Sequence, residues 1–257
     1  MAMHNFRLPV TLFSGVLFLE LLLTAVLPTQ VYAQLANATS GKTLSSRSAL
    51  QVTFDPPKDG QPDDSAGGAS RGGGICPQDA KVGSPITPLM PANRYGLTVA
   101  DHPTFFVYVP QTSAQKALFV LKDKNEDYYY HKTLSLPSTA GIISFTLPTD
   151  VPAIEIGKRY QWSFVMACGE AIRPDSPGVK GQIQRIEPNQ GLLSQLKNLS
   201  PLERAALYGK NGIWYDTLTS LAQVRREQPG DSTLRANWEE LLRSVGLGAI
   251  ATKPLLQ

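Results

Sequence analysis

The stretch SPLERAALYGKNGIWYDTLTSLAQVRREQPGD, Ser200 to Asp231, decides the architecture of the C-terminal part, because it carries the signals for two consecutive helices. Ser200, Pro201 and Glu203 form a strong helix start: the serine accepts a hydrogen bond from a free backbone amide, proline costs nothing at the first position, and the glutamate closes a capping box. A second helical pattern begins at Trp214 and ends at Pro229-Gly230. The stretch therefore predicts a helical hairpin.

Further helical patterns flank this hairpin. Leu192, Leu193 and Leu196 indicate a short helix before it. Behind it, apolar residues at helical spacing run from Leu234 to Val245, and a glycine follows where helices often end. We therefore predict a small C-terminal helical domain over residues 189–257.

Residues 75–188 carry a different pattern, in which short β-type runs alternate with turn residues and no helical period lies between them. This pattern is typical of an antiparallel sandwich. Tyr160 follows a glycine turn and precedes the alternating Trp162 and Phe164, a spacing that resembles the tyrosine corner of immunoglobulin-like sandwiches. The predicted fold class is α+β: an antiparallel immunoglobulin-like β-sandwich followed by the helical domain. The runs are YGLTVA, TFFVYVP, ALFVLKD, DYYYHKTLSLP, GIISFTLP, RYQWSFVMAC and VKGQIQRI.

Residues 1–33 indicate a signal peptide. Arg7 precedes a long apolar run, and Val31-Tyr32-Ala33 offers small residues for cleavage before Gln34. Retention as a membrane anchor is the alternative, but Glu20 in the middle of the run would cost about 2–3 kcal/mol in a bilayer. We expect an exported protein, in the periplasm or outside the cell, without stable membrane insertion after cleavage.

The segment after the signal peptide is poor in large apolar residues. Its stretch FDPPKDGQPDDSAGGASRGGG gathers proline, glycine, serine and aspartate, a composition that cannot offset the entropy of ordering. We therefore predict a disordered linker over residues 34–74.

Export makes the cysteines interpretable. Cys76 and Cys168 form an even pair, which in an oxidising compartment most simply makes one disulfide between the start of the β region and the end of a strand. The alternative is two buried free thiols. With two cysteines and three scattered histidines in the chain, we expect neither a metal site nor a cofactor.

The charge pattern argues against a nucleic-acid partner. The formal net charge is only +3, and basic and acidic residues are interleaved along the chain rather than gathered in one run.

No catalytic set is evident. The chain has no GxSxG elbow, and its one Asp-His neighbour pair is Asp101-His102. Because adjacent side chains on an extended backbone point to opposite sides, we expect His102 to serve at a turn or strand entry rather than in catalysis. We therefore predict that the protein is not an enzyme.

Three consecutive tyrosines offer a second kind of candidate site. On a strand, Tyr128 and Tyr130 share one face and Tyr129 takes the other. Aromatic rings on either face could stack on sugars. The alternative is that one face belongs to the core and the other simply covers the sheet.

Part of the hairpin resembles a tetratricopeptide repeat. The matching small, aromatic, glycine, aromatic, apolar and closing proline positions are Ala205, Tyr208, Gly212, Trp214, Leu221 and Pro229. Two positions depart from the repeat, since Pro201 stands where its first tryptophan would be and Thr217 replaces a small alanine. The resemblance implies binding positions on the concave side at Leu202, Ala206, Gly209 and Lys210. The hairpin would then dock a partner, cover an exposed face of the sheet, or do both.

A wider resemblance spans nearly the whole chain after the signal peptide. GLTVADHPTFFVYVP, GKRYQWSF, GQIQRIEP and the Ser200–Asp231 stretch, in this order, resemble the cyanobacterial domain-of-unknown-function family 928. The resemblance implies an exported protein with a β region followed by a helical region, and it implies no activity.

Three functions are compatible with these observations. The first is an exported, non-enzymatic interaction or scaffold module that presents its helical hairpin to another envelope or secreted protein. The second is a carbohydrate-binding module that uses exposed tyrosines, and the third is a hydrolase with dispersed site residues. We expect the first, because exported β modules without a visible active site more often bind than catalyse.

Overall fold

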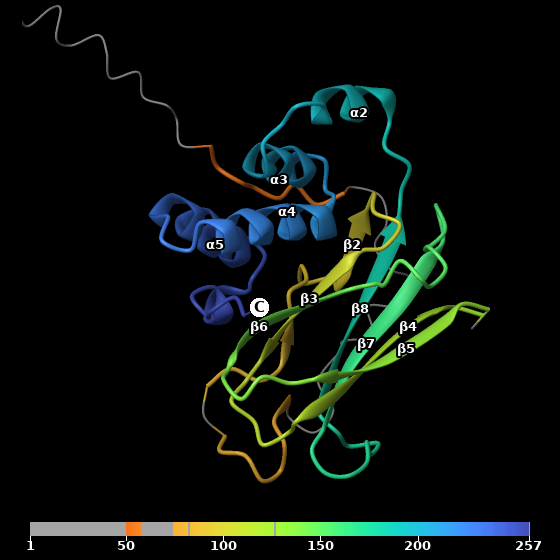
Figure 1. The fold of residues 1–257 in the computed structure, drawn as a ribbon, viewed down its shortest axis with the longest axis vertical. Helices are drawn as coiled ribbons and strands as arrows, with labels where there is room; N and C mark the ends of the chain where they lie inside the picture. The colour runs from red at the N-terminus through yellow and green to blue at the C-terminus, as the bar shows by residue number, and fades with distance from the viewer. Residues whose placement is uncertain (1–49, 58–73, 82, 126, 257) are drawn as a thin grey trace, which may run out of the picture. The chain divides into compact units, whose positions relative to one another are not determined.

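The computed structural model describes residues 50–57, 74–81, 83–125 and 127–256. The predicted signal peptide lies outside these residues. Residues 47–257 form one compact unit, which is α+β as predicted, with two sheets and four α-helices in its described part (Figure 1). None of the helices in the described ranges has the length and apolar character needed to span a membrane.

The smaller sheet has three antiparallel strands in the order β1-β3-β6. β3 (Thr104–Val109) and β6 (Gly141–Thr146) lie where two of the predicted runs lie. β1 (Thr87–Pro88) was not predicted, because a strand of two residues leaves no alternating pattern in the sequence.

The larger sheet has five strands in the order β2-β8-β7-β4-β5, and all five coincide with predicted runs. Its strands pair antiparallel except β2 with β8, which run parallel. The strands are β2 (Tyr95–Thr98), β4 (Lys116–Asp123), β5 (Tyr129–Ser135), β7 (Arg159–Ala167) and β8 (Gly178–Arg185).

The inward side chains of the sheets form an aromatic core. The ring of Phe105 in β3 contacts Phe119 in β4 and Trp162 in β7, at centroid distances of 4.8 and 5.6 Å. The hydroxyl of Tyr160 accepts a hydrogen bond from the Glu155 amide, five residues earlier in the chain, at 3.0 Å. This bond fixes the loop that enters the central strand β7.

The helical part follows the predicted order. It consists of α2 (Gln190–Leu196), α3 (Pro201–Lys210), α4 (Trp214–Glu227) and α5 (Ser232–Ser244). The capping box is confirmed, since the side chains of Ser200 and Glu203 each bond the other residue's backbone amide.

Helix α4 covers β2 and β3 and completes their core. The Trp162 indole N–H donates to the Tyr215 hydroxyl at 2.7 Å, and the Trp214 indole N–H donates to the Leu89 carbonyl at 2.8 Å. Gly96 permits the close approach of Tyr215 to β2, since a Cβ on Gly96 would lie 2.8 Å from the Tyr215 ring. Buried residues of the sheets and of α3 to α5 belong to one hydrophobic cluster, which crosses the predicted domain boundary between residues 188 and 189.

Residues 50–57 differ from the linker predicted over 34–74. This segment, called the strap below, packs against the helices, and Val52 is buried. In Figure 1 it is the orange segment that passes α3 and α4. The prediction rested on composition, and the few apolar side chains of the strap suffice because the helices supply the rest of the surface that buries them.

Tyr215 carries the link between helix and sheet, because its hydroxyl also donates to the Gln182 carbonyl at 3.1 Å. Tyr215→Phe would leave the buried Trp162 indole N–H without its acceptor. We expect this substitution to lower the free energy of unfolding by about 1–3 kcal/mol, measured by chemical denaturation.

Tyr129→Phe is the matched control, because the Tyr129 side chain is 56% exposed. Its effect should stay within about 0.5 kcal/mol. Equal effects of the two substitutions would contradict a stabilising role for the Trp162–Tyr215 bond.

Candidate functional site

The strap is held by its main chain. The Val52 amide donates to Asn237 Oδ1 at 2.7 Å, and the Asp55 amide donates to the Gly209 carbonyl at 3.0 Å. Gly209 must lack a side chain here, because a Cβ would lie 2.0 Å from the Thr53 carbonyl oxygen. Gly212 has a φ of +70°, and a Cβ on it would lie 2.9 Å from the backbone carbonyl oxygen of Asp55. We call Gly209, Gly212, Trp214 and Asn237 the strap site.

The side chains of the strap alternate between the helices and solvent. Val52 is buried and Phe54 is half-buried, whereas Thr53 and Asp55 are exposed. The Phe54 ring meets Trp214 edge-on at a centroid distance of 4.8 Å. This alternation is that of an extended peptide laid on a surface.

The structure distributes the four predicted concave-side positions unevenly. Gly209 is buried under the strap, and Lys210 is exposed. Leu202 and Ala206 are half-buried and pack against the hydrophobic cluster. Among these positions, only Gly209 belongs to the strap site.

Asn237 was not predicted as a site residue, although its side-chain oxygen accepts the hydrogen bond from the Val52 amide of the strap. It is a buried polar residue of α5 and stands next to Trp238 on the apolar face of the helix. A polar residue at such a position needs a hydrogen-bond partner. That requirement was the signal available in the sequence.

The tyrosines of the β5 region divide between the two faces of the sheet. Tyr128 and Tyr130 are half-buried against the core, and the Tyr128 hydroxyl donates to the Pro152 carbonyl at 2.9 Å. Burial raises the pKa of Tyr128 to about 12. Tyr129 is the exposed one, with its ring 5.5 Å from that of His131. A stacking platform built on Tyr128 and Tyr130 would have to use rings that already contact the core.

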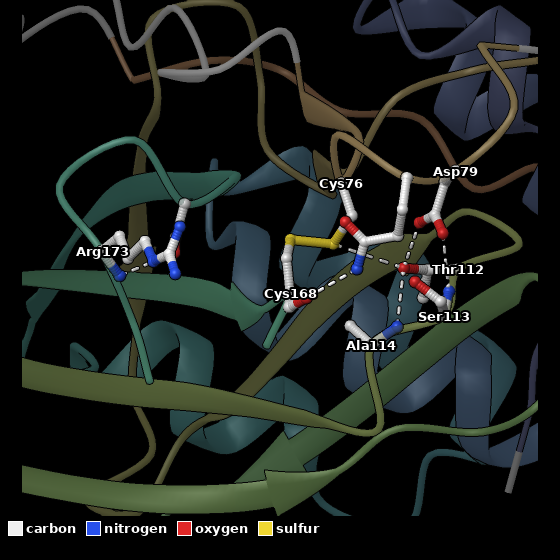
Figure 2. Close-up of a disulfide and its surroundings, with 9 residues drawn as sticks. Cys76, Asp79, Thr112, Ser113, Ala114, Cys168 and Arg173 are labelled. Carbon is white, nitrogen blue, oxygen red and sulfur yellow. Dashed lines mark hydrogen bonds between the residues drawn. A yellow bond between two sulfur atoms is a disulfide. The ribbon is translucent and has the colours of Figure 1, made fainter. Parts of the chain in front are cut away.

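Cys76 and Cys168 form the predicted disulfide, with their Cα atoms 5.5 Å apart (Figure 2). The segment that holds Cys76 is tied down further, since Thr112 Oγ1 donates to Asp79 Oδ2 at 2.6 Å and the Ser113 amide donates to Asp79 Oδ1 at 2.9 Å. The cross-link therefore joins the start of the β region to the end of β7, as expected from the spacing.

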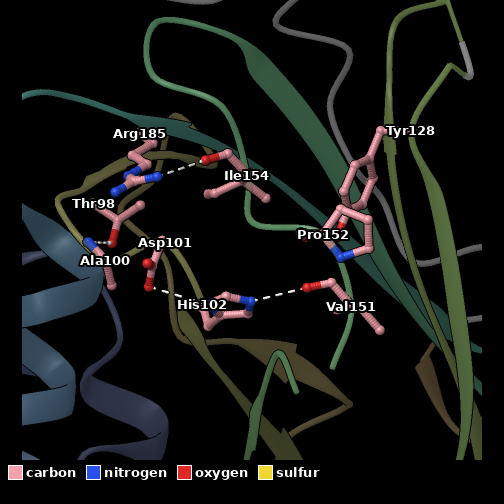
Figure 3. A network of polar contacts seen from close by, with 9 residues as sticks. All are labelled: Thr98, Ala100, Asp101, His102, Tyr128, Val151, Pro152, Ile154 and Arg185. Atoms are coloured by element: carbon pink, nitrogen blue, oxygen red, sulfur yellow. Dashed lines mark hydrogen bonds and ion pairs between the residues drawn. The ribbon is translucent and has the colours of Figure 1, made fainter. Parts of the chain in front are cut away.

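A polar network surrounds the Asp101-His102 pair (Figure 3). His102 Nδ1 lies 3.1 Å from Asp101 Oδ1, and Nε2 lies 3.1 Å from the Val151 carbonyl. The expectation that these neighbouring side chains diverge was wrong, because residues 101 and 102 form a bend and not an extended strand. The pair joins the β2–β3 connection to the loop after β6.

Both ring nitrogens of His102 face acceptors. A neutral imidazole carries one N–H and satisfies only one of them, whereas the imidazolium satisfies both. The hydrogen bond to Val151, followed by the one to Asp101, therefore raises the pKa of His102, against the opposing effects of burial and Arg185. Within the described residues, no group of three His, Cys, Asp or Glu side chains is placed to hold a metal ion.

A second ionisable group lies at the junction of β2 and α4. Asp216 Oδ2 accepts from Thr98 Oγ1 at 2.8 Å and from the Val99 amide at 3.1 Å. Burial raises the pKa of Asp216 to about 6, although these hydrogen bonds act in the opposite direction.

The raised pKa of His102 predicts a pH effect on stability. The stabilisation is complete below the unfolded-state pKa of about 6.5 and is lost as pH rises through the folded-state pKa. We expect the unfolding free energy of the wild type to exceed that of His102→Gln at pH 6 and to converge toward it at pH 8, measured by denaturation at each pH. A constant difference would contradict this.

Asp216 predicts an effect on the acidic side. Its folded-state pKa of about 6 lies above the ordinary aspartate value of 3.8, so the native state binds the proton more tightly and gains stability as pH falls from about 6 to 4. Relative to Asp216→Asn, the wild type should gain about 1–2 kcal/mol over this range, a figure reduced for the partial exposure of the residue. Parallel pH profiles of the two proteins, from thermal unfolding, would contradict the burial argument.

Comparison with known proteins bears on the family alone. No curated protein and no solved structure matches the chain. A family model described as Domain of Unknown Function (DUF928) matches residues 66–255, which include all the described strands and helices. The match covers well over half of the chain and agrees with the resemblance found in its motifs. The chain therefore belongs to the DUF928 family.

Proposed function

We propose that this protein is an exported, non-enzymatic interaction module whose strap site holds an extended segment of another envelope or secreted protein. The observation that carries the proposal is the way the site holds the strap. Val52 and Asp55 are bound through backbone amides, and Gly209 lets the strap backbone approach the helix. Main-chain contacts of this kind suit any extended peptide, whatever its sequence.

The inward side chains set the preference of the site. The site buries the aliphatic side chain of Val52, and two residues later in the strap the ring of Phe54 packs against Trp214. A partner segment would therefore carry an aliphatic and an aromatic residue two positions apart. The protein's own strap competes for the same site, and it does so within one molecule, which gives it a high effective concentration.

The architecture supports an interaction role. The described strands form two sheets, in the orders β1-β3-β6 and β2-β8-β7-β4-β5, and the Tyr160 hydroxyl anchors the loop before the central strand β7. These two features support an immunoglobulin-like sandwich. We propose that the β region is such a sandwich and that α3 and α4 form a tetratricopeptide-like hairpin. Both architectures serve widely as binding scaffolds.

Export and the absence of catalysis belong to the same proposal. The Cys76–Cys168 disulfide suits an oxidising compartment, the periplasm or the medium. Both nitrogens of His102, the strongest catalytic candidate, contact acceptors within the fold, so neither is directed at a substrate.

Peptide exchange tests the proposal directly. The starting protein is the chain from residue 34 on, which contains the whole compact unit, and its variant lacks residues 34–57. A labelled peptide LQVTFDPP, residues 50–57, should bind the strap-deleted variant in fluorescence anisotropy at least about tenfold more tightly than it binds the intact chain, because the site is free only in the variant.

Two glycine substitutions control the experiment. Gly209→Ala in the strap-deleted variant should abolish peptide binding, because a Cβ there overlaps the bound backbone. Gly230→Ala, where a Cβ meets nothing within 4 Å, should leave it intact. A folded strap-deleted variant that binds no peptide would refute the proposal, and so would loss of folding on strap deletion, since the strap would then be an obligatory part of the core.

A further inference from the structure

The outer face of the larger sheet has a distinct charge pattern. Its strands alternate, so one side of β4, β5, β7 and β8 faces the core and the other faces outward. The helices lie at the β2 and β3 side, and β5 is the opposite edge of the sheet (Figure 1). We call the outward side chains of these four strands the basic face.

Charges on the basic face have one sign. Lys116, Arg159 and Lys180 point outward and are exposed, and Lys122 lies between them, half-buried. No outward position of the four strands holds an acidic residue, and the one acidic residue in them, Asp123, is buried and paired with Lys158. The net charge of the chain is only +3, whereas the outward positions of these strands carry four basic side chains and no acidic one.

Neutral groups between the cations suit a sugar chain. Tyr129 offers a ring that is 56% exposed on the edge strand, beside His131. Gln161 is exposed and stands opposite Gln182 on the next strand, so amides line the middle of the face. A sheet face with an exposed aromatic ring and amide groups can stack on the apolar faces of pyranose rings and hydrogen-bond their hydroxyls.

The spacing of the cations favours a polymer over a small anion. Lys180 pairs with Ser163, and Arg159 lies four residues from Ser163 along β7, which corresponds to about 13 Å. Lys116 lies four residues from Val120, the partner of Ser163 on β4, in the opposite direction along the sheet. A long chain with charges at intervals can reach all three of these side chains at once, which a single small anion cannot.

We propose that the basic face binds an acidic polysaccharide, with Lys116, Lys180 and Arg159 facing its carboxylates and Tyr129 stacking on a sugar ring. A double-stranded nucleic acid fits less well, because it carries a phosphate charge about every 1.7 Å and needs a denser array of cations. A membrane surface fits less well too, because Tyr129 is the one large hydrophobic side chain of these strands that is exposed. The proposal does not depend on the strap site.

Affinity electrophoresis tests the proposal with the chain from residue 34 on, in native gels that contain polygalacturonic acid. We expect retardation relative to a gel without the polymer, reduced by added salt and absent with neutral dextran. The double variant Lys116→Gln, Lys180→Gln should bind about tenfold more weakly, and Tyr129→Ala about fivefold more weakly.

A matched double variant, Lys81→Gln with Lys197→Gln, removes the same charge from exposed positions outside the basic face. It should bind like the wild type. Equal weakening by both double variants, or no retardation at all, would overturn the proposal. Equally strong binding of a DNA duplex or of anionic phospholipid vesicles, lost in the same face variant, would overturn the choice of a polysaccharide.

Discussion

The structure depends on one hydrogen-bonded contact between helix and sheet. Trp162 stands on the inner face of the central strand β7, and its indole N–H needs an acceptor where water is excluded. The acceptor is the hydroxyl of Tyr215 in α4. Helix α4 therefore supplies the acceptor that the buried indole of the sheet needs. Gly96 provides the space in which the Tyr215 ring lies against β2.

This contact explains why the β region carries a helical hairpin. Trp214 and Tyr215 fill the core of the β region, so their helix acts as a cover for the sheets. The strap lies on the helical part as well, where its backbone amides bond to Asn237 in α5 and Gly209 in α3. The helical part thus has one face committed to stability and another that already holds an extended peptide.

Two surfaces remain with distinct chemistry, and they lie on different elements. The strap site uses glycines, an aromatic ring and Asn237 on α3 to α5, and it suits a peptide backbone. The basic face uses exposed cations and Tyr129 on the strands, and it suits an anionic chain. A module that held both kinds of partner would connect a protein to an acidic glycan, which fits the proposed place of the protein outside the cytoplasm.

Sequence patterns alone were enough to predict most strands, the helices and the disulfide. Capping residues, glycine and proline stops and alternating runs predicted α2 to α5 and β2 to β8, because these signals are local in the sequence. The even cysteine pair predicted the disulfide, because two cysteines allow only one pairing. Three features could not be predicted before the chain was seen folded: residues 50–57 pack on the helices, Asp101 contacts His102, and Tyr129 is the exposed member of the three consecutive tyrosines. Each of these depends on which surface a segment meets, and residues distant in the chain supply that surface.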